Sequence, residues 1–303
     1  MLDKSLIVLV GPTAIGKTAA SIQIAKEFNW PILSADSRQF FKEMSIGTAK
    51  PSAEEMQNIP HYFIDSHSIA DDYNVGKYET EAIELLDKLF KTNETIVLVG
   101  GSGLYIDAIC QGFDELPEAD PEVRTKINTL LEEKGIEALQ ALLKELDPEY
   151  YSKVDLQNPQ RMSRALEVCL TTGEPYSALR KGNVKKRDFN IIKIGLNTDR
   201  EILYERINKR VDEMMKMGLL EEVETLVPMK HSNALQTVGY KELFDFLENK
   251  TDLNTAIDSI KQNTRKFAKR QLTWFRRDEE IKWFEPNQSE AIIKFIHNKI
   301  KKS

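Results

Sequence analysis

Residues 5–18 read Ser5-Leu-Ile-Val-Leu-Val10-Gly11-Pro-Thr-Ala-Ile-Gly16-Lys17-Thr18, a short apolar run that passes directly into a glycine-containing loop. The loop, Gly11 to Thr18, matches G-x-x-x-x-G-K-[ST] at every defined position. The continuous apolar run predicts a strand that is buried on both faces of a parallel sheet, and residues 16–28 predict a helix. A strand, this loop and a helix form the context in which the motif binds phosphate.

The chemistry of the loop suits an anionic ligand. Its glycines allow the backbone to turn tightly, so that several N–H groups point inward, and the helix N-terminus adds a partial positive charge. Lys17 supplies a full positive charge to the outer phosphate, and the Thr18 hydroxyl can hold Mg²⁺. The loop alone leaves open which diphosphate or triphosphate it binds.

Strand-like and helix-like segments alternate over the first ~110 residues. Alternation of this kind predicts an α/β fold, a P-loop NTPase-like core whose parallel sheet is flanked by helices. Further strands are predicted at 31–35, 61–64 and 95–99, and further helices at 77–91 and after Gly100-Gly-Ser-Gly103.

The pattern then becomes helical, with predicted helices at 121–134, 136–146 and 160–171. Asp120-Pro121 and Asn158-Pro159 are typical helix starts. Strand character returns at 189–196, long helices follow to about residue 275, and a strand at 281–284 and a helix at 289–300 complete the pattern. The sequence therefore predicts a catalytic core of residues 1–113 and 189–303, and an all-helical insertion domain of residues 114–188.

Composition excludes several classes of protein. With 41% hydrophobic residues and mixed charge, the 303-residue chain is not of the disordered type. Its apolar runs are too short to cross a bilayer, which predicts no membrane partner. Met1-Leu-Asp-Lys-Ser5 lacks a signal-peptide layout, and Cys110 and Cys169 have neither pairing nor metal spacing, so we expect a reducing cytoplasm.

The net charge of −6 hides an uneven distribution. Residues 114–149 contain eleven acids and four bases, whereas residues 261–277 contain seven bases, no acid and three aromatic residues. Residues 180–187 add five bases in eight positions. Basic stretches with interleaved aromatics suit an RNA backbone and unstacked bases, although a basic helix is often only a solvated face.

The residues that follow two of the predicted strands indicate which chemistry the site could perform. Asp36 follows the strand at 31–35 and should lie beside the phosphate loop, where it could orient Mg²⁺ or accept a proton; alternatively it caps the next helix. The strand at 95–99 ends in Gly100-Gly-Ser-Gly103 instead of the Asp that an ATPase would carry. NTP hydrolysis is therefore disfavoured. The glycines either approach a ligand or form a plain turn.

Arg206 and Arg210 lie four positions apart in a predicted helix, and therefore on one face of it. If that face meets the phosphate loop, one of the two could clamp a diphosphate. Surface pairing with Glu205 or Asp212 is the alternative.

Further motifs follow in order along the chain. They are Ser34-Ala-Asp-Ser-Arg-Gln39, Ile46-Gly-Thr-Ala-Lys-Pro51, Val99-Gly-Gly-Ser-Gly-Leu-Tyr105, Asp120-Pro-Glu-Val-Arg124, Pro159-Gln-Arg-Met-Ser-Arg-Ala-Leu-Glu-Val168, Val238-Gly-Tyr240 and Lys269-Arg-Gln-Leu-Thr-Trp-Phe-Arg276. With the phosphate loop, they make the chain resemble the bacterial tRNA dimethylallyltransferase family, also called tRNA isopentenyltransferases, from Gly11 to Arg276. Ser102 stands where that family more often has Thr, and it keeps the hydroxyl.

The resemblance implies an enzyme that transfers a dimethylallyl group from dimethylallyl diphosphate to N6 of the adenosine at tRNA position 37, next to the anticodon. Diphosphate leaves and Mg²⁺ assists. The implied partner is the tRNA anticodon stem-loop, gripped by the insertion domain, and the implied state is a monomer. The alternatives are a prenyltransferase acting on free adenine nucleotide, a P-loop small-molecule kinase and a non-enzymatic RNA-binding module.

Matching motifs carry the family's site residues onto this sequence. The resemblance implies that Asp36 is the general base, with Thr13, Lys17 and Arg210 as the other catalytic residues and Thr18 as the metal ligand. The implied diphosphate-binding residues are Gly11, Thr13, Ala14, Ile15, Gly16, Lys17, Thr18 and Arg210. The implied tRNA-binding residues are Asp36, Ser37, Arg38, Gln39, Ser102, Arg124, Gln160, Arg161, Met162, Ser163, Arg164, Lys269, Arg270, Trp274 and Arg276. The target base would be flipped out of its stack.

Overall fold

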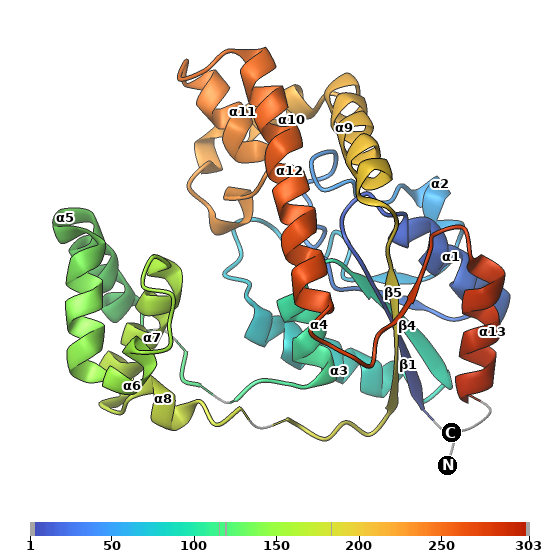
Figure 1. The fold of residues 1–303 in the computed structure, drawn as a ribbon, viewed down its shortest axis with the longest axis horizontal. Helices are drawn as coiled ribbons and strands as arrows, with labels where there is room; N and C mark the ends of the chain where they lie inside the picture. Colours follow the sequence, from blue (N-terminus) through green and yellow to red (C-terminus); the bar gives the residue numbers. More distant parts are fainter. Residues whose placement is uncertain (1–3, 115, 119, 183, 301–303) are drawn as a thin grey trace. The chain divides into compact units, whose positions relative to one another are not determined.

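Six parallel strands form one sheet in the order β3-β2-β4-β1-β5-β6 in the computed structural model, which describes residues 4–114, 116–118, 120–182 and 184–300 (Figure 1). The predicted α/β fold with a parallel sheet is confirmed. The strands are β1 (Ser5–Val10), β2 (Ile32–Ser34), β3 (His61–Tyr62), β4 (Thr95–Gly100), β5 (Asn190–Leu196) and β6 (Lys282–Phe284).

The side chains of β1 alternate between two apolar layers, as the period of two in a strand requires. Leu6 and Val8 pack with helices α3 (Val75–Leu89) and α4 (Gly103–Cys110) on one face. Ile7 and Leu9 pack on the other face with α1 (Lys17–Phe28), α9 (Arg200–Lys216) and α13 (Ser289–Ile300). Because both faces are covered, β1 reads as an unbroken apolar run.

A third apolar cluster joins α9 to α10 (Leu219–Thr225), α11 (Tyr240–Leu247) and α12 (Leu253–Phe275). Phe41 and Met44 of the segment after β2 also belong to it. The short helices η1 (Val227–Met229) and η2 (Asn233–Leu235) contribute to this cluster, whereas α2 (Ala53–Met56) does not. This cluster supports the helices that border the site described below.

The chain divides into two compact units, Met1–Cys110 with Arg187–Ser303, and Gln111–Lys186, where the sequence predicts an insertion of residues 114–188. The second unit contains α5 (Pro121–Leu146), α6 (Pro148–Tyr151), α7 (Pro159–Thr172) and α8 (Tyr176–Leu179). Its core is built from α5 and α7, with Ile127, Leu143 and Leu166 fully buried or nearly so.

The helix boundaries of the second unit follow local sequence signals. Asp120 and Asn158 cap α5 and α7 with their side chains, and proline occupies the first turn of each helix, as predicted. Gly135, at φ 75°, interrupts α5 between the two helices that the sequence predicts there. No helix in the described segments is long and apolar enough to cross a membrane.

Candidate active site

The phosphate loop lies where the direction of strand order reverses. β1 has β4 and β2 on one side and β5 and β6 on the other, and ligands bind at the carboxyl ends of strands at such a point. The buried Ile15 side chain anchors the loop in the apolar layer beneath α1, so this residue can offer a ligand only its backbone. Gly16, at φ 105°, turns the chain into α1, which begins at Lys17.

Lys17 folds back over its own loop. Its Nζ atom donates to the carbonyl oxygens of Gly11, at 3.0 Å, and Pro12, at 2.8 Å. Burial lowers the pKa of Lys17 to about 8; the nearby Asp36 carboxylate opposes this shift and Arg210 adds to it. Asp36 therefore favours the protonated form of Lys17, and Arg210 disfavours it.

The face of α9 that carries Arg206 and Arg210 meets the phosphate loop. Arg206 donates from Nη1 to the carbonyl of Ile15, at 3.2 Å, and Arg210 lines the adjoining cavity. Burial lowers the pKa of Arg210, while attraction to carboxylates led by Asp36 opposes the shift. Asp212, the alternative surface partner, pairs instead with Lys261, at 2.6 Å. The condition that this face meets the loop is therefore met, and the clamping of a diphosphate by one of these arginines stays a prediction.

Asp36 closes a turn after β2 instead of capping an α-helix. Its Oδ1 accepts from the N–H of Arg38, at 3.1 Å, and its carbonyl accepts from Gln39, at 3.2 Å. The hydroxyl of Ser102 accepts from the Ser37 N–H and donates to the Ser37 hydroxyl, both at 3.0 Å. Ser102 and the Asp36 turn are therefore neighbours across 65 residues of sequence.

The glycines after β4 make room for α12. A Cβ atom on Gly101 would lie 2.4 Å from Nε2 of Gln271, and one on Gly103 would lie 2.4 Å from the Trp274 ring. Gln271 is 7% exposed; it accepts from the Thr13 N–H and donates to the Gly101 carbonyl, both at 2.8 Å. These two positions therefore require glycine because side chains of the protein itself approach them closely.

A cavity of about 770 Å³ joins these groups within the first unit. Its polar lining includes Thr13, Asp36, Arg38, Ser102, Arg210 and Arg270. Its apolar lining includes Val211, Met214, Leu219, Val238, Ile260 and Phe267. Arginine side chains, the Asp36 carboxylate and an apolar wall in a single cavity suit a ligand that has both a charged and an apolar part.

Two predicted tRNA-binding residues of the second unit, Arg124 and Arg164, pair with Glu167, which is 5% exposed. Arg124 Nε lies 2.9 Å from Oε1 of Glu167, and Arg164 Nη1 lies 3.3 Å from Oε2. Gln160 and Arg161 are exposed. Met162 is fully buried in the core of this unit, so the prediction that it binds tRNA is wrong for its side chain.

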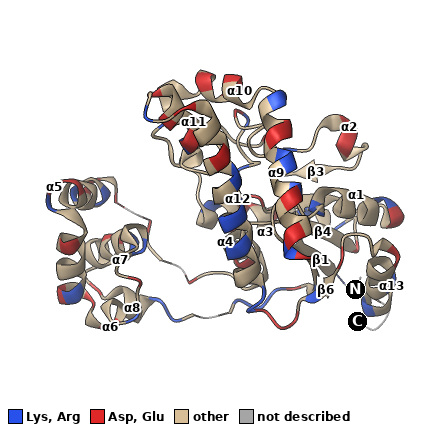
Figure 2. Ribbon diagram, turned by 45° about the horizontal axis from the view of Figure 1, so that its top comes forward, with Lys and Arg blue, Asp and Glu red and all other residues tan. Residues whose placement is uncertain are grey.

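The two basic stretches differ in structure. On α12, Lys269 and Arg270 are exposed, as is Arg276 at its end, and Figure 2 shows basic residues along this helix. In the other stretch, Arg187 pairs with Glu79 at 3.0 Å and donates to the Ile109 carbonyl, with its side chain only 11% exposed. Arg187 therefore stabilises the fold. Its position in a basic run of the sequence does not indicate this role.

Sequence reasoning missed Gln271 as a member of the site. It occupies the buried face of α12 together with Ala268 and Phe275. A polar residue at an apolar position of the helical period was the available signal, because a buried amide needs partners.

Oxygen donors near the loop fit Mg²⁺. The Thr18 hydroxyl at the start of α1 and the Asp36 carboxylate are ligands of the kind this hard cation accepts. Among the described residues, no group of three or more His, Cys, Asp or Glu could hold a metal. A magnesium ion here would therefore rely on diphosphate oxygens and water, which is its usual mode of binding.

Comparison with known proteins identifies the family of this chain. The family model described as IPP transferase matches residues 39–278. The tRNA dimethylallyltransferase of Christiangramia forsetii is 56% identical over 99% of both chains. The crystal structure of a tRNA isopentenylpyrophosphate transferase from Bacillus halodurans has a TM-score of 0.73 and 35% identity, covering 99% of this chain and 97% of its own. A eukaryotic dimethylallyltransferase acting on tRNA has a TM-score of 0.80 and 26% identity, covering 97% of this chain and 80% of its own. The chain therefore belongs to the IPP transferase family.

Proposed function

We propose that this enzyme transfers the dimethylallyl group of dimethylallyl diphosphate to N6 of adenosine at tRNA position 37, acting as a monomer in the cytoplasm. The observation that carries the proposal is the cavity that is lined by Asp36, by Thr13 of the phosphate loop and Arg210, and by an apolar wall. The names of the relatives, tRNA dimethylallyltransferases, support the same reaction.

The proposed reaction is a displacement at C1 of the dimethylallyl group. The adenine N6 forms the new bond to C1 while the bond from C1 to the diphosphate oxygen breaks. Asp36 accepts the proton that N6 loses, as its position in the cavity allows. Negative charge grows on the leaving diphosphate, where the loop N–H groups, Lys17 and Arg210 stabilise it. A bound Mg²⁺ would neutralise part of that charge, held by Thr18 and the diphosphate itself.

Recognition of tRNA is proposed to use both units. In the first unit Asp36, Ser37, Arg38, Ser102 and Arg270 line the cavity, and Lys269 and Arg276 offer further exposed cationic side chains. In the second unit Arg124 and Arg164, both held by Glu167, offer cationic groups to the anticodon stem. Arg38, which lines the cavity beside Asp36, could stack on or bond to an extruded base.

The test is to incubate the protein with labelled dimethylallyl diphosphate and Mg²⁺, and to offer it either undermodified tRNA or AMP. We expect label in tRNA that has adenosine at position 37, and none in a matched tRNA with guanosine there. Label in AMP but not in tRNA would establish the free-nucleotide prenyltransferase instead. Transfer of phosphate from ATP without prenyl transfer would establish the kinase.

A further inference from the structure

Two sequence motifs have no chemical role in the reaction proposed above, Ile46-Gly-Thr-Ala-Lys-Pro51 and Val238-Gly-Tyr240. In the structure both are bound by one side chain, Glu222 of α10. Its Oε2 accepts from the N–H groups of Ser45, at 3.0 Å, and Ile46, at 2.7 Å. Its Oε1 accepts from the Gly47 N–H, at 3.1 Å, and from the Tyr240 hydroxyl, at 2.6 Å.

Glu222 therefore holds three consecutive backbone N–H groups and a phenol at once. Hydrogen bonds to an ionised carboxylate are shorter and stronger than those between neutral groups. The Tyr240 side chain is fully buried, so its hydroxyl needs a partner. Glu222 is consequently the polar connection between the segment 45–47 and the helices α10 and α11.

Gly47 seats this segment flat on the Tyr240 ring. A Cβ atom at Gly47 would lie 2.5 Å from Cε2 of that ring, closer than any side chain can approach. The pairing of Gly47 with Tyr240 thus explains why each motif carries its residue, since the ring fills the space that a side chain would need.

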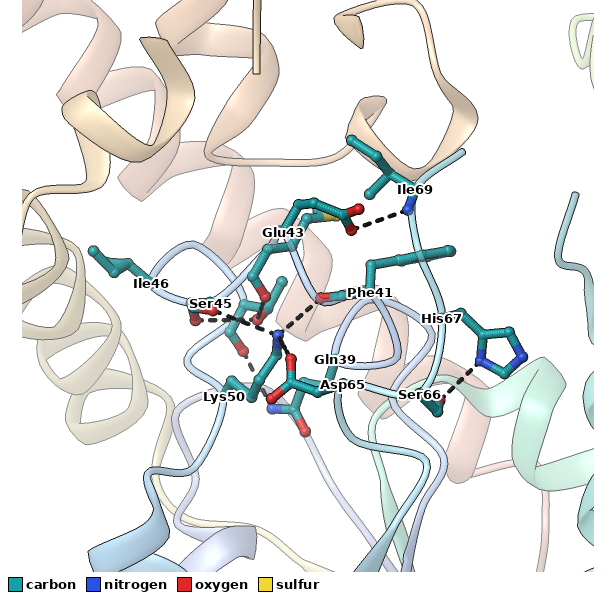
Figure 3. A network of polar contacts seen from close by, with 12 residues as sticks. Gln39, Phe41, Glu43, Ser45, Ile46, Lys50, Asp65, Ser66, His67 and Ile69 are labelled. Atoms are coloured by element: carbon teal, nitrogen blue, oxygen red, sulfur yellow. Dashed lines mark hydrogen bonds and ion pairs between the residues drawn. The ribbon is translucent and has the colours of Figure 1, made fainter. Parts of the chain in front are cut away.

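Hydrogen bonds and an ion pair with neighbouring residues also hold this segment in place, as Figure 3 shows. The side chain of Lys50 is 5% exposed; it donates to the Phe41 carbonyl, at 2.8 Å, and pairs with Asp65. Gln39 donates from Nε2 to the carbonyls of Thr48 and Ala49, both at 3.2 Å. Residues 45–50 therefore form a rigid segment joined through Gln39 to the turn that carries Asp36.

Gly47 and Thr48 form part of the cavity wall, together with the apolar Val211, Met214 and Leu219. Leu219 belongs to α10, the helix that carries Glu222. We propose that Glu222 is a positioning residue that holds the segment 45–50 against α10 and thereby sets the width of the cavity where the prenyl chain lies. This inference rests on the proposed function, because it assigns the apolar wall to a prenyl group.

The test compares Glu222→Gln with Glu224→Gln, which lies exposed on the same helix. The amide of Glu222→Gln has the same size, but its NH₂ must face N–H donors, so the segment should move. We expect unchanged affinity for inorganic diphosphate, which the phosphate loop holds, and about tenfold weaker binding of dimethylallyl thiolodiphosphate. We also expect the ratio of geranyl to dimethylallyl transfer to rise, with the KM for tRNA unchanged. Glu224→Gln should match the wild type throughout.

Tyr240→Phe provides a second variant that keeps the ring and removes one donor. Its effects on thiolodiphosphate binding and on the ratio of geranyl to dimethylallyl transfer should have the same direction as those of Glu222→Gln and be smaller. Tyr240→Phe decides the question if Glu222→Gln does not fold. Equal loss of diphosphate and thiolodiphosphate binding, or no loss of either, would overturn the positioning role. If the wild type binds the thiolodiphosphate no better than diphosphate and transfers no prenyl group, the proposed function itself is wrong.

Discussion

The side chain of Gln271 accepts a hydrogen bond from the backbone N–H of Thr13 over 2.8 Å, although 258 positions separate the two residues. Its amide nitrogen donates to the Gly101 carbonyl at the same distance. One side chain on α12 therefore connects the loop after β1 to the turn after β4. Because Thr13 lines the cavity, this connection fixes the loop backbone at a residue that we propose binds the diphosphate.

We expect Gln271→Met to lower kcat/KM for dimethylallyl diphosphate by about tenfold or more. The change leaves two buried backbone groups without their partner, which costs about 1–3 kcal/mol each. Steady-state kinetics at saturating tRNA would measure the loss, and tRNA affinity should be retained. Gln262→Met, at an exposed position of the same helix, is the matched control. Unchanged kinetics in Gln271→Met would show that the bridge has no positioning role.

Asp36→Asn should abolish most turnover while sparing tRNA binding. Asparagine can still accept the hydrogen bond from the Arg38 N–H, so the turn should persist, but it cannot take the N6 proton. A positioned general base contributes about 10²- to 10⁴-fold to a rate. Single-turnover transfer and a tRNA gel shift would separate the two effects, with the exposed Asp72→Asn as control. Transfer near the wild-type rate would remove Asp36 from the mechanism.

Binding of the diphosphate should weaken as the pH rises through the pKa of Lys17, which burial lowers to about 8. The protonated amine attracts the anion, so affinity is complete below this pKa and falls above it. For a single group of this pKa we expect about a tenfold loss between pH 7 and pH 9. Titration calorimetry with dimethylallyl thiolodiphosphate would measure it. Lys17→Gln should bind more weakly at both pH values and show a flatter profile; an equally steep profile would assign the effect to another group.

Lys269→Gln should weaken tRNA binding and reduce its dependence on salt. Lys269 is exposed and makes no ion pair within the part of the chain that the structure describes. Each phosphate contact contributes about one to the slope of log affinity against log salt. Lys261→Gln is the control on the same helix, because Lys261 is already paired with Asp212. A similar slope in Lys269→Gln and the wild type would place the RNA away from this part of α12.

The features that could be predicted from the sequence are those that depend on contiguous residues. The strand at residues 5–10, the loop and α1 follow one another, and their structure depends on local backbone preferences and on a period that both faces of the sheet satisfy. The starts of α5 and α7 and the break at Gly135 likewise depend on caps and on one backbone angle. Such features depend on a few neighbouring residues, which is why the fold class and the phosphate loop could be recognised.

The functions of individual polar residues depended on long-range packing. Arg187 lies in a basic run, yet it turns inward to Glu79, and Met162 lies in a motif predicted to bind tRNA, yet it packs in a core. Gln271 reaches Thr13, and Glu222 reaches the segment 45–47, across more than 170 residues. The physical reason is that hydrogen bonds of this kind form only after helices and sheet have packed, and no local pattern encodes the partner. The chemistry of the loop could therefore be predicted from its own residues, whereas the groups that hold the cavity in shape emerged only from the folded molecule.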